Sequence, residues 1–143
     1  MGRPLARIPT KSLPLWFDPV PLDLEAKPFG PFAASARLTK AGDIVVVATP
    51  GHTADHLSVL LQDEETTFFL AGDSSYNEQL MLAGRVDGVS ADEHISGATL
   101  DAIRGFTQFR PTVYLPTHDP QSAVRLANHC LVGILERTAL QAA

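Results

Sequence analysis

His52, Asp73 and His118 each stand a few residues after a short apolar run of the sequence. Loops at strand ends collect binding residues, because a rigid sheet holds them in place. Two imidazoles and one carboxylate form a ligand set that suits zinc or a similar divalent ion. The three residues lie far apart in the chain, so only folding could bring them together. Their types and positions predict a metal site made of His52, Asp73 and His118.

The same residues also have a purely structural interpretation. In that interpretation His52 caps a turn, Asp73 caps a loop and His118 bonds a backbone carbonyl. Spacing by itself favours this second interpretation, since no two of the three residues share a short motif.

The local sequence around these residues resembles the metallo-β-lactamase superfamily. Thr-Pro-Gly-His-Thr-x-x-His at 49–56, Ala-Gly-Asp at 71–73 and Pro-Thr-His-Asp at 116–119 are similar, in this order, to the motifs of its second half. Three ordered motifs are more specific than any one of them. The segments 73–76 and 118–120 are similar to the N-acyl-homoserine lactonase branch, with Asp-x-x-Tyr and His-Asp-Pro.

This resemblance implies a role for each matched residue. His52 would bind a first metal ion, His118 would bind a second, and Asp73 would bridge the two. Tyr76 would donate a hydrogen bond to the substrate carbonyl, and His56 would support the loop around His52 without binding metal. The implied catalytic residues are Asp73 and Tyr76, and the implied cofactor is one or two divalent ions, with zinc expected.

The implied activity is that of a lactonase-type metallohydrolase, with quorum quenching as its setting. A metal ion lowers the pKa of bound water, and the resulting hydroxide would open a lactone or ester. The superfamily's first-half signature, His-x-His-x-Asp-His, is absent, because no two of the five histidines are separated by one residue. The resemblance therefore implies one half of an αββα sandwich, which is incomplete or needs self-association to act.

The alternative function is a truncated, catalytically inactive half-fold that binds metal weakly or not at all. Such a half would expose the sheet surface that normally meets the missing half. Both alternatives predict a homo-oligomer, and a two-fold dimer is the form expected, in which each copy replaces the other's absent half.

The elements that must position these residues follow from hydrophobic periodicity and turn signals. Apolar runs predict five strands, at residues 35–38, 44–48, 57–61, 67–71 and 112–115. A helical period predicts a helix over 91–108, with Ser90 as N-cap, and a last helix begins at Asp119-Pro120. The expected fold class is α/β, a mixed sheet with helices packed on one face.

Prolines divide the chain. Seven of the 11 prolines fall in the first 31 residues, where they exclude a continuous helix or central strand. The sequence therefore predicts an irregular arm over residues 1–32, with Trp16 as its packing anchor, followed by the half domain over 33–143.

Composition excludes several classes of protein. The 143 residues carry a net charge of −5, which argues against a partner nucleic acid. No apolar run approaches the roughly 18 residues of a membrane span, so we expect no membrane partner and a cytoplasmic location. The single cysteine, Cys130, excludes an internal disulfide. His94 and His129 are expected to be surface or packing residues, and the partner expected is a small lactone or ester.

Overall fold

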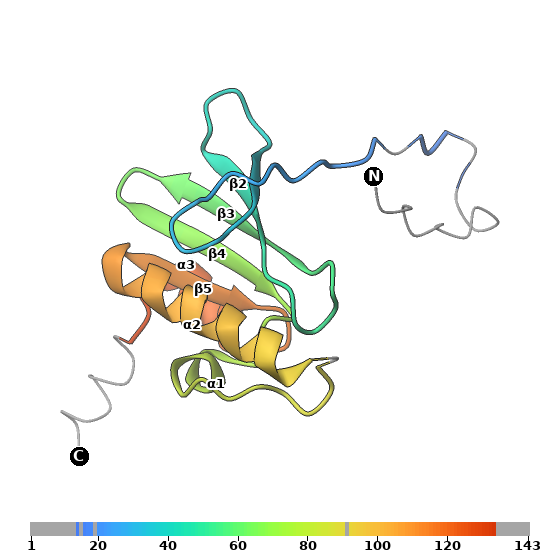
Figure 1. The fold of residues 1–143 in the computed structure, drawn as a ribbon. Helices are drawn as coiled ribbons and strands as arrows, with labels where there is room; N and C mark the ends of the chain where they lie inside the picture. Colours follow the sequence, from blue (N-terminus) through green and yellow to red (C-terminus); the bar gives the residue numbers. More distant parts are fainter. Residues whose placement is uncertain (1–13, 15, 19, 91, 134–143) are drawn as a thin grey trace, which may run out of the picture.

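Five strands form one mixed sheet in the computed structural model, which describes residues 14, 16–18, 20–90 and 92–133 (Figure 1). Their order in the sheet is their order in the chain: β1 (Ser35–Arg37), β2 (Ile44–Ala48), β3 (Leu57–Asp63), β4 (Thr66–Gly72) and β5 (Thr112–Pro116). β1 to β4 pair antiparallel, and β4 pairs parallel with β5. The predicted α/β fold with a mixed sheet is confirmed.

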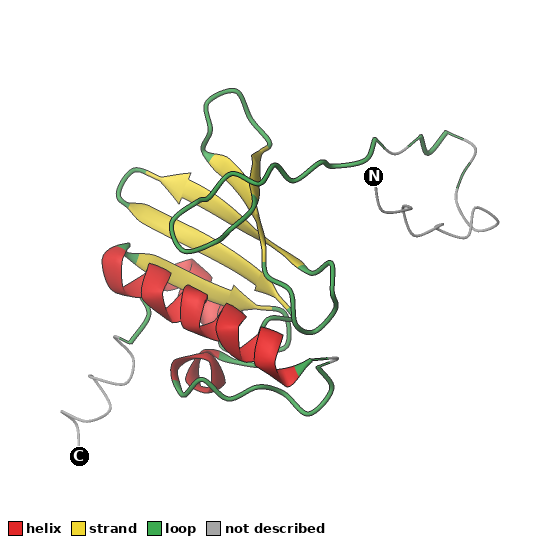
Figure 2. Cartoon of the chain, in the orientation of Figure 1, coloured by secondary structure: helices red, strands yellow, loops and turns green. Residues whose placement is uncertain are grey.

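Three helices accompany the sheet: α1 (Glu78–Leu82), α2 (Glu93–Phe109) and α3 (Ser122–Asn128). α1 and α2 form the crossover between the parallel strands β4 and β5, and α2 lies across one face of the sheet (Figure 2). α3 packs along β5, and at its end the ring of His129 lies 5.1 Å from that of Phe68.

The core lies between α2 and the sheet. Val45, Leu60, Phe69 and Tyr114 are register partners across β2 to β5, and all four are buried. Phe106 of α2 packs on this row, with its ring 5.9 Å from that of Phe69. Fully burying an aliphatic or aromatic side chain stabilises a fold by roughly 1.5–3 kcal/mol, so this row fixes the helix on the sheet.

The start of α2 differs from the prediction. Asp92 is the N-cap, and its carboxylate accepts hydrogen bonds from the amides of His94 and Ile95, both at 3.0 Å. A carboxylate suits this position because it also interacts favourably with the helix dipole. Ser90 instead donates its hydroxyl to Asp87, at 2.6 Å. The prediction of Ser90 as N-cap was wrong by two residues.

The last helix begins two residues later than predicted and is short. α3 ends at Asn128 because His129 adopts a left-handed conformation, with φ of 50°. Asp119 accepts the amide of Gln121 at 2.9 Å but precedes the helix, whose N-cap is Gln121. The sequence continues with apolar residues at helical spacing, Ile134 and Leu135, which lie outside the described residues.

The proline-rich segment has two distinct parts. Phe32 is buried, with its ring 5.8 Å from those of both Phe69 and Phe106. Trp16 is 81% exposed and makes an edge contact with the neighbouring Phe17. The prediction of Trp16 as a packing anchor was therefore wrong, because the aromatic residues nearest the sheet fill that role. Among the described residues, no helix has the length and apolar character to cross a membrane.

Tyr114 gives a prediction on alkaline stability. Burial raises its pKa far above the ordinary value of 10, and its hydroxyl bonds Ser75 Oγ at 2.9 Å. The folded chain keeps the proton that the unfolded chain loses, so stability is full below about pH 10 and falls as the pH rises further. Tyr114→Phe should cost about 1 kcal/mol at pH 7 and lessen this alkaline loss, in urea unfolding at pH 7 to 11. Parallel pH curves for the two proteins would contradict the prediction.

Candidate functional site

Three strand ends meet at one edge of the sheet. β2, β4 and β5 run in the same direction, because two antiparallel pairings separate β2 from β4 and a parallel pairing joins β4 to β5. Gly72 pairs with Pro116, and the amide of Thr117 donates to the carbonyl of Gly72 at 2.9 Å. The loops that follow these strands carry His52, Asp73 and His118, which are thus brought together.

Each histidine faces a different oxygen of the Asp73 carboxylate. His118 Nε2 lies 3.2 Å from Asp73 Oδ1, and His52 Nε2 lies 3.9 Å from Asp73 Oδ2. The His118 side chain is 57% exposed, whereas those of Asp73 and His52 are 36% and 31% exposed. Solvent therefore reaches the site from the side of His118.

The donor types at this site, two imidazoles and a carboxylate, fit zinc. Asp73 Oδ1 is buried and accepts no hydrogen bond of good geometry, although His118 Nε2 lies 3.2 Å from it. Within the part of the chain that the structure describes, however, no three His, Cys, Asp or Glu side chains form a group that could hold one metal ion. The arrangement is two histidine–carboxylate pairs sharing Asp73.

Tyr76, the other residue with a predicted catalytic role, lies on the loop between β4 and α1. Its ring is 5.8 Å from that of His118, at 65° to it, and the residue is 40% exposed. An exposed phenol beside an exposed imidazole can contact a molecule that enters from solvent. The structure thus brings all four predicted site residues to one edge of the sheet.

His56 links two of the loops. The amide of Asp73 donates to His56 Nε2 at 3.0 Å, while His56 Nδ1 lies 3.0 Å from the carbonyl of Thr49. Nε2 must be unprotonated to accept, so Nδ1 carries the proton and donates it. Burial lowers the pKa of His56 below its ordinary value of 6.5, which keeps the ring neutral. His56 therefore contacts the start of the His52 loop, for which the sequence predicted support, and it supports the Asp73 loop as well.

Two glycines permit these contacts. Gly72 has φ of +58°, and a Cβ there would lie 2.8 Å from His56 Nε2. At Gly51 a Cβ would lie 2.8 Å from the Cα of Ser96, so only glycine allows the start of α2 to lie against the His52 loop. Both positions hold the loop backbones at separations that a side chain would prevent.

A buried ionic cluster lies behind the site. Arg125 donates to Asp119 and, through Nε, to the carbonyl of Tyr114 at 3.0 Å. Arg125 Nε also lies 3.5 Å from Glu78 Oε2. Burial opposes the ionisation of Asp119, but the hydrogen bonds it accepts, from Arg125 above all, outweigh this and lower its pKa. The cluster ties the loop that carries His118 to α1 and α3.

Asp87 is the residue near the site that sequence reasoning missed. Its Oδ2 lies 3.7 Å from His52 Nδ1, and its side chain is 5% exposed. It belongs to the connection between α1 and α2, where no motif marks it. The only local signal was an aspartate in a turn before Gly88, which is common in proteins of every class.

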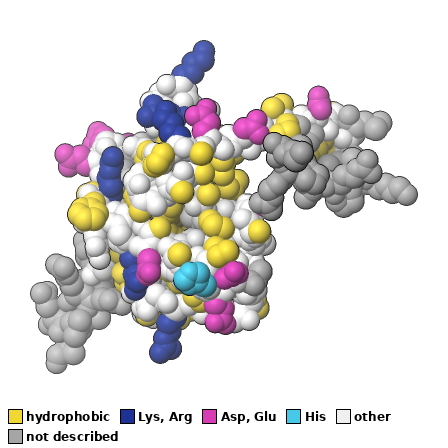
Figure 3. Space-filling view, viewed as in Figure 1, with side chains coloured by type: hydrophobic (Ala, Val, Ile, Leu, Met, Phe, Trp, Pro, Cys, Tyr) yellow, Lys and Arg dark blue, Asp and Glu magenta, His cyan; other side chains and the backbone are white. Residues whose placement is uncertain are grey.

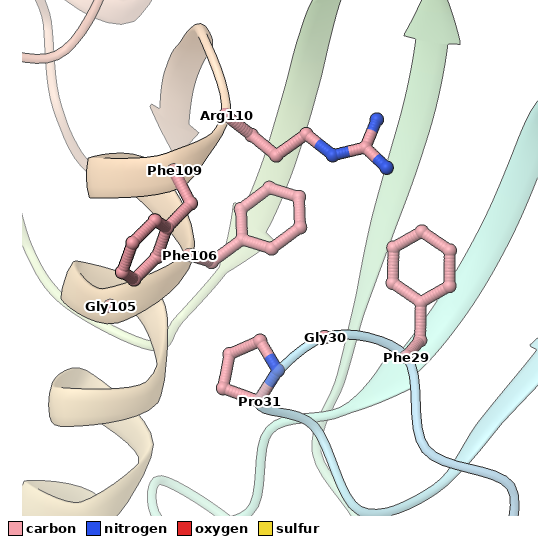
Figure 4. Close-up of a pocket in the computed structure, with 7 residues that line it drawn as sticks. All are labelled: Phe29, Gly30, Pro31, Gly105, Phe106, Phe109 and Arg110. Carbon is pink, nitrogen blue, oxygen red and sulfur yellow. The ribbon is translucent and has the colours of Figure 1, made fainter.

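An apolar cavity lies away from these residues. Phe29, Pro31, Phe106 and Phe109 line a hollow of about 370 Å³ between the loop before β1 and the end of α2 (Figure 4). Arg110 extends over it, and no candidate site residue contributes to it. On the face seen in Figure 3, hydrophobic side chains gather in the middle while most charged ones lie near the rim.

Comparison with solved structures identifies the fold. The chain is similar to an N-acyl homoserine lactone hydrolase solved with the product N-hexanoyl-L-homoserine bound at its catalytic metal centre, at 17% identity and a TM-score of 0.54. A second structure, from work on how indirect contributions of mutations underlie optimization of new enzyme function, aligns with the same values. The sequence matches no protein-family model and no curated protein.

The similarity covers 69% of this chain and 37% of the lactone hydrolase. The chain thus has the fold of part of a metallo-β-lactamase-type lactonase, as the resemblance implied. At this identity the likeness shows the fold alone, and the roles of His52, Asp73, Tyr76 and His118 stay predictions.

Gly72→Ala should unfold more easily than the wild type. A left-handed conformation costs a non-glycine residue roughly 1–2 kcal/mol, and the new Cβ would also push the His56 ring from the Asp73 amide. Gly97→Ala is the matched control, because Gly97 lies within α2 with its nearest atom 4.0 Å from the new Cβ. That variant should gain up to about 1 kcal/mol from helix propensity. Urea unfolding would contradict the argument if both variants shifted in the same direction.

Proposed function

We propose that the chain contributes His52, Asp73 and His118 to the metal site of a lactonase-type hydrolase. The observation that carries the proposal is the carboxylate of Asp73, whose two oxygens face two different imidazoles. His52, Asp73 and His118 would be the residues that hold divalent metal there, and the metal would supply Lewis-acid chemistry. The partial fold match to a lactone hydrolase with a metal centre supports the same function.

Each residue has a part in opening a lactone. A zinc ion held by these residues would polarise a carbonyl and lower the pKa of water. His52 and His118 hold their rings toward Asp73, and the His56 bond to the Asp73 amide fixes the loop that carries the carboxylate. Tyr76 is exposed beside His118 and donates a hydrogen bond to the carbonyl oxygen of the substrate, where negative charge develops. The substrate class is an N-acyl-homoserine lactone or a similar ester, which places the activity in quorum quenching.

Zinc binding tests the ligand set. Wild-type protein freed of metal with a chelator should bind zinc in isothermal titration calorimetry, and His118→Ala should lose most of that affinity. His94→Ala is the control, because His94 is an exposed residue in the first turn of α2. Equal affinities for wild type and His118→Ala would contradict the proposed site.

Ring opening of N-hexanoyl-homoserine lactone tests the chemistry in the same proteins. His118→Ala should abolish the rate above background. Tyr76→Phe should lower it on the order of 10²-fold, the usual effect of removing one hydrogen-bond donor to a developing oxyanion. Should Tyr76→Phe react as fast as wild type, Tyr76 has no such role.

The ligand set is short for two ions. Zinc in proteins takes four ligands in structural sites and three plus water in catalytic ones. Three shared side chains cannot supply two ions at that level. This shortage favours the second candidate function, a half-fold without hydrolase activity by itself.

The face of the sheet opposite α2 supports self-association, although Phe68 and Val113 on it are already buried and His129, at the end of α3, packs on Phe68. Two rows of register partners across β2 to β5 point away from the core and are wholly apolar. They are Ile44, Leu61, Phe68 and Val113, and Val46, Val59, Leu70 and Leu115. Leu70 is 46% exposed and Leu61 is 36% exposed. We propose that a second copy covers this face in a dimer and brings its own strand ends toward the site.

Leu70→Lys should shift the chain toward monomer in sedimentation velocity over a range of concentrations, because it places a charge in the apolar face. Phe109→Lys is the control, since Phe109 is 86% exposed on the opposite side of the sheet. The wild type and Phe109→Lys should both associate. A wild type that stays monomeric at tens of micromolar, or a Phe109→Lys protein that alone dissociates, would contradict the proposed interface.

A further inference from the structure

Asp87 is a buried carboxylate whose surroundings are unequal at its two oxygens. Its side chain is 5% exposed, although it lies in the connection between two helices. The two hydrogen bonds that described residues make to it end on Oδ1, one from Ser90 Oγ at 2.6 Å and one from the amide of Val89 at 3.3 Å. Oδ2 is left facing His52.

His52 Nδ1 is the complementary atom. It is buried, it has no hydrogen-bond partner, and it lies 3.7 Å from Asp87 Oδ2. An uncompensated buried polar atom is costly, so the pair gains by an attractive arrangement. That arrangement is a proton on Nδ1. A carboxylate faces each nitrogen, but Asp87 lies nearer to Nδ1 and is 5% exposed, whereas Asp73, 3.9 Å from Nε2, is 36% exposed and water screens its charge.

The other nitrogen of the ring points toward the proposed metal site. His52 Nε2 lies 3.9 Å from Asp73 Oδ2, and the two nitrogens lie on different sides of the imidazole. Asp87 therefore cannot share an ion with His52 Nε2. A proton held on Nδ1 leaves the lone pair of Nε2 free, which is the form of histidine that binds metal.

We propose that Asp87 is a positioning residue that sets the tautomer and orientation of His52. The effect of Asp87 on metal affinity rests on the function proposed above. Its effect on the tautomer of His52 does not. The turn over residues 87–90 aims the carboxylate, and the carboxylate holds the ring with Nε2 toward Asp73. A partner of this kind usually changes metal affinity by about 10- to 100-fold.

The tautomer is measured directly by nitrogen-15 NMR of the histidine rings in the metal-free protein, at a pH where His52 is neutral. In the wild type, Nδ1 of His52 should show the protonated signature and Nε2 the bare one. In Asp87→Asn, which removes the charge and keeps the shape, the populations should move toward the Nε2-protonated form. Asp63→Asn, an exposed change at the end of β3, should leave them unchanged.

Zinc titration of the same three proteins gives the second readout. Asp87→Asn should bind zinc about 10- to 100-fold more weakly than the wild type and Asp63→Asn. If no protein binds zinc but the tautomer shifts as expected, the proposed metal site fails and the action of Asp87 on the ring stands. If the tautomer shifts and the zinc affinities stay equal, the value of Asp87 to the metal is refuted.

Two results overturn the proposal outright. One is a wild-type His52 with its proton on Nε2, which needs no variant. The other is an Asp87→Asn protein with the wild-type tautomer. Should Asp87→Asn fail to fold, Ser90→Ala replaces it, because it removes the 2.6 Å bond that aims the carboxylate. An unchanged tautomer in folded Ser90→Ala would then overturn the proposal.

Discussion

The parallel pairing of β4 with β5 is the contact on which the candidate site depends. It sets Gly72 beside Pro116, so that the residues just beyond them, Asp73 and His118, come within 3.2 Å of one another. A slip of one residue in this register would turn every side chain of the shifted strand to the other face of the sheet. The apolar row that contains Phe69 prevents such a slip, because it must stay under α2. The packing of the sheet against α2 thereby fixes how Asp73 and His118 lie at the ends of β4 and β5.

Much of the fold could be predicted because strong local patterns and tertiary packing agree. The β-branched run of β2 and the helical period of α2 each specify their element without help from distant residues. Short elements were harder. α1 has five residues, and its cap is the side chain of Asn77, which accepts the amide of Leu80. Such a turn gains its stability from contacts with the rest of the chain, and periodicity cannot reveal those.

The site was predictable only in its outline. His52, Asp73 and His118 follow strands that end at the same edge, and the sequence order of strands and motifs was enough to expect their meeting. The neighbours that hold them were not predictable in the same way. Asp87 is distant in sequence from His52, and Asp73 is distant in sequence from His56. Only the folded structure shows that these residues contact one another.

The double engagement of His56 has a consequence for coordination. An inward-facing imidazole this close to Asp73 would ordinarily compete for an arriving cation and draw it to a misplaced position. Here the Asp73 amide occupies Nε2, and Thr49 lies at Nδ1. His56 is therefore not available as a metal ligand. Its hydrogen bonds to backbone groups, and not its distance from Asp73, prevent it from binding a cation.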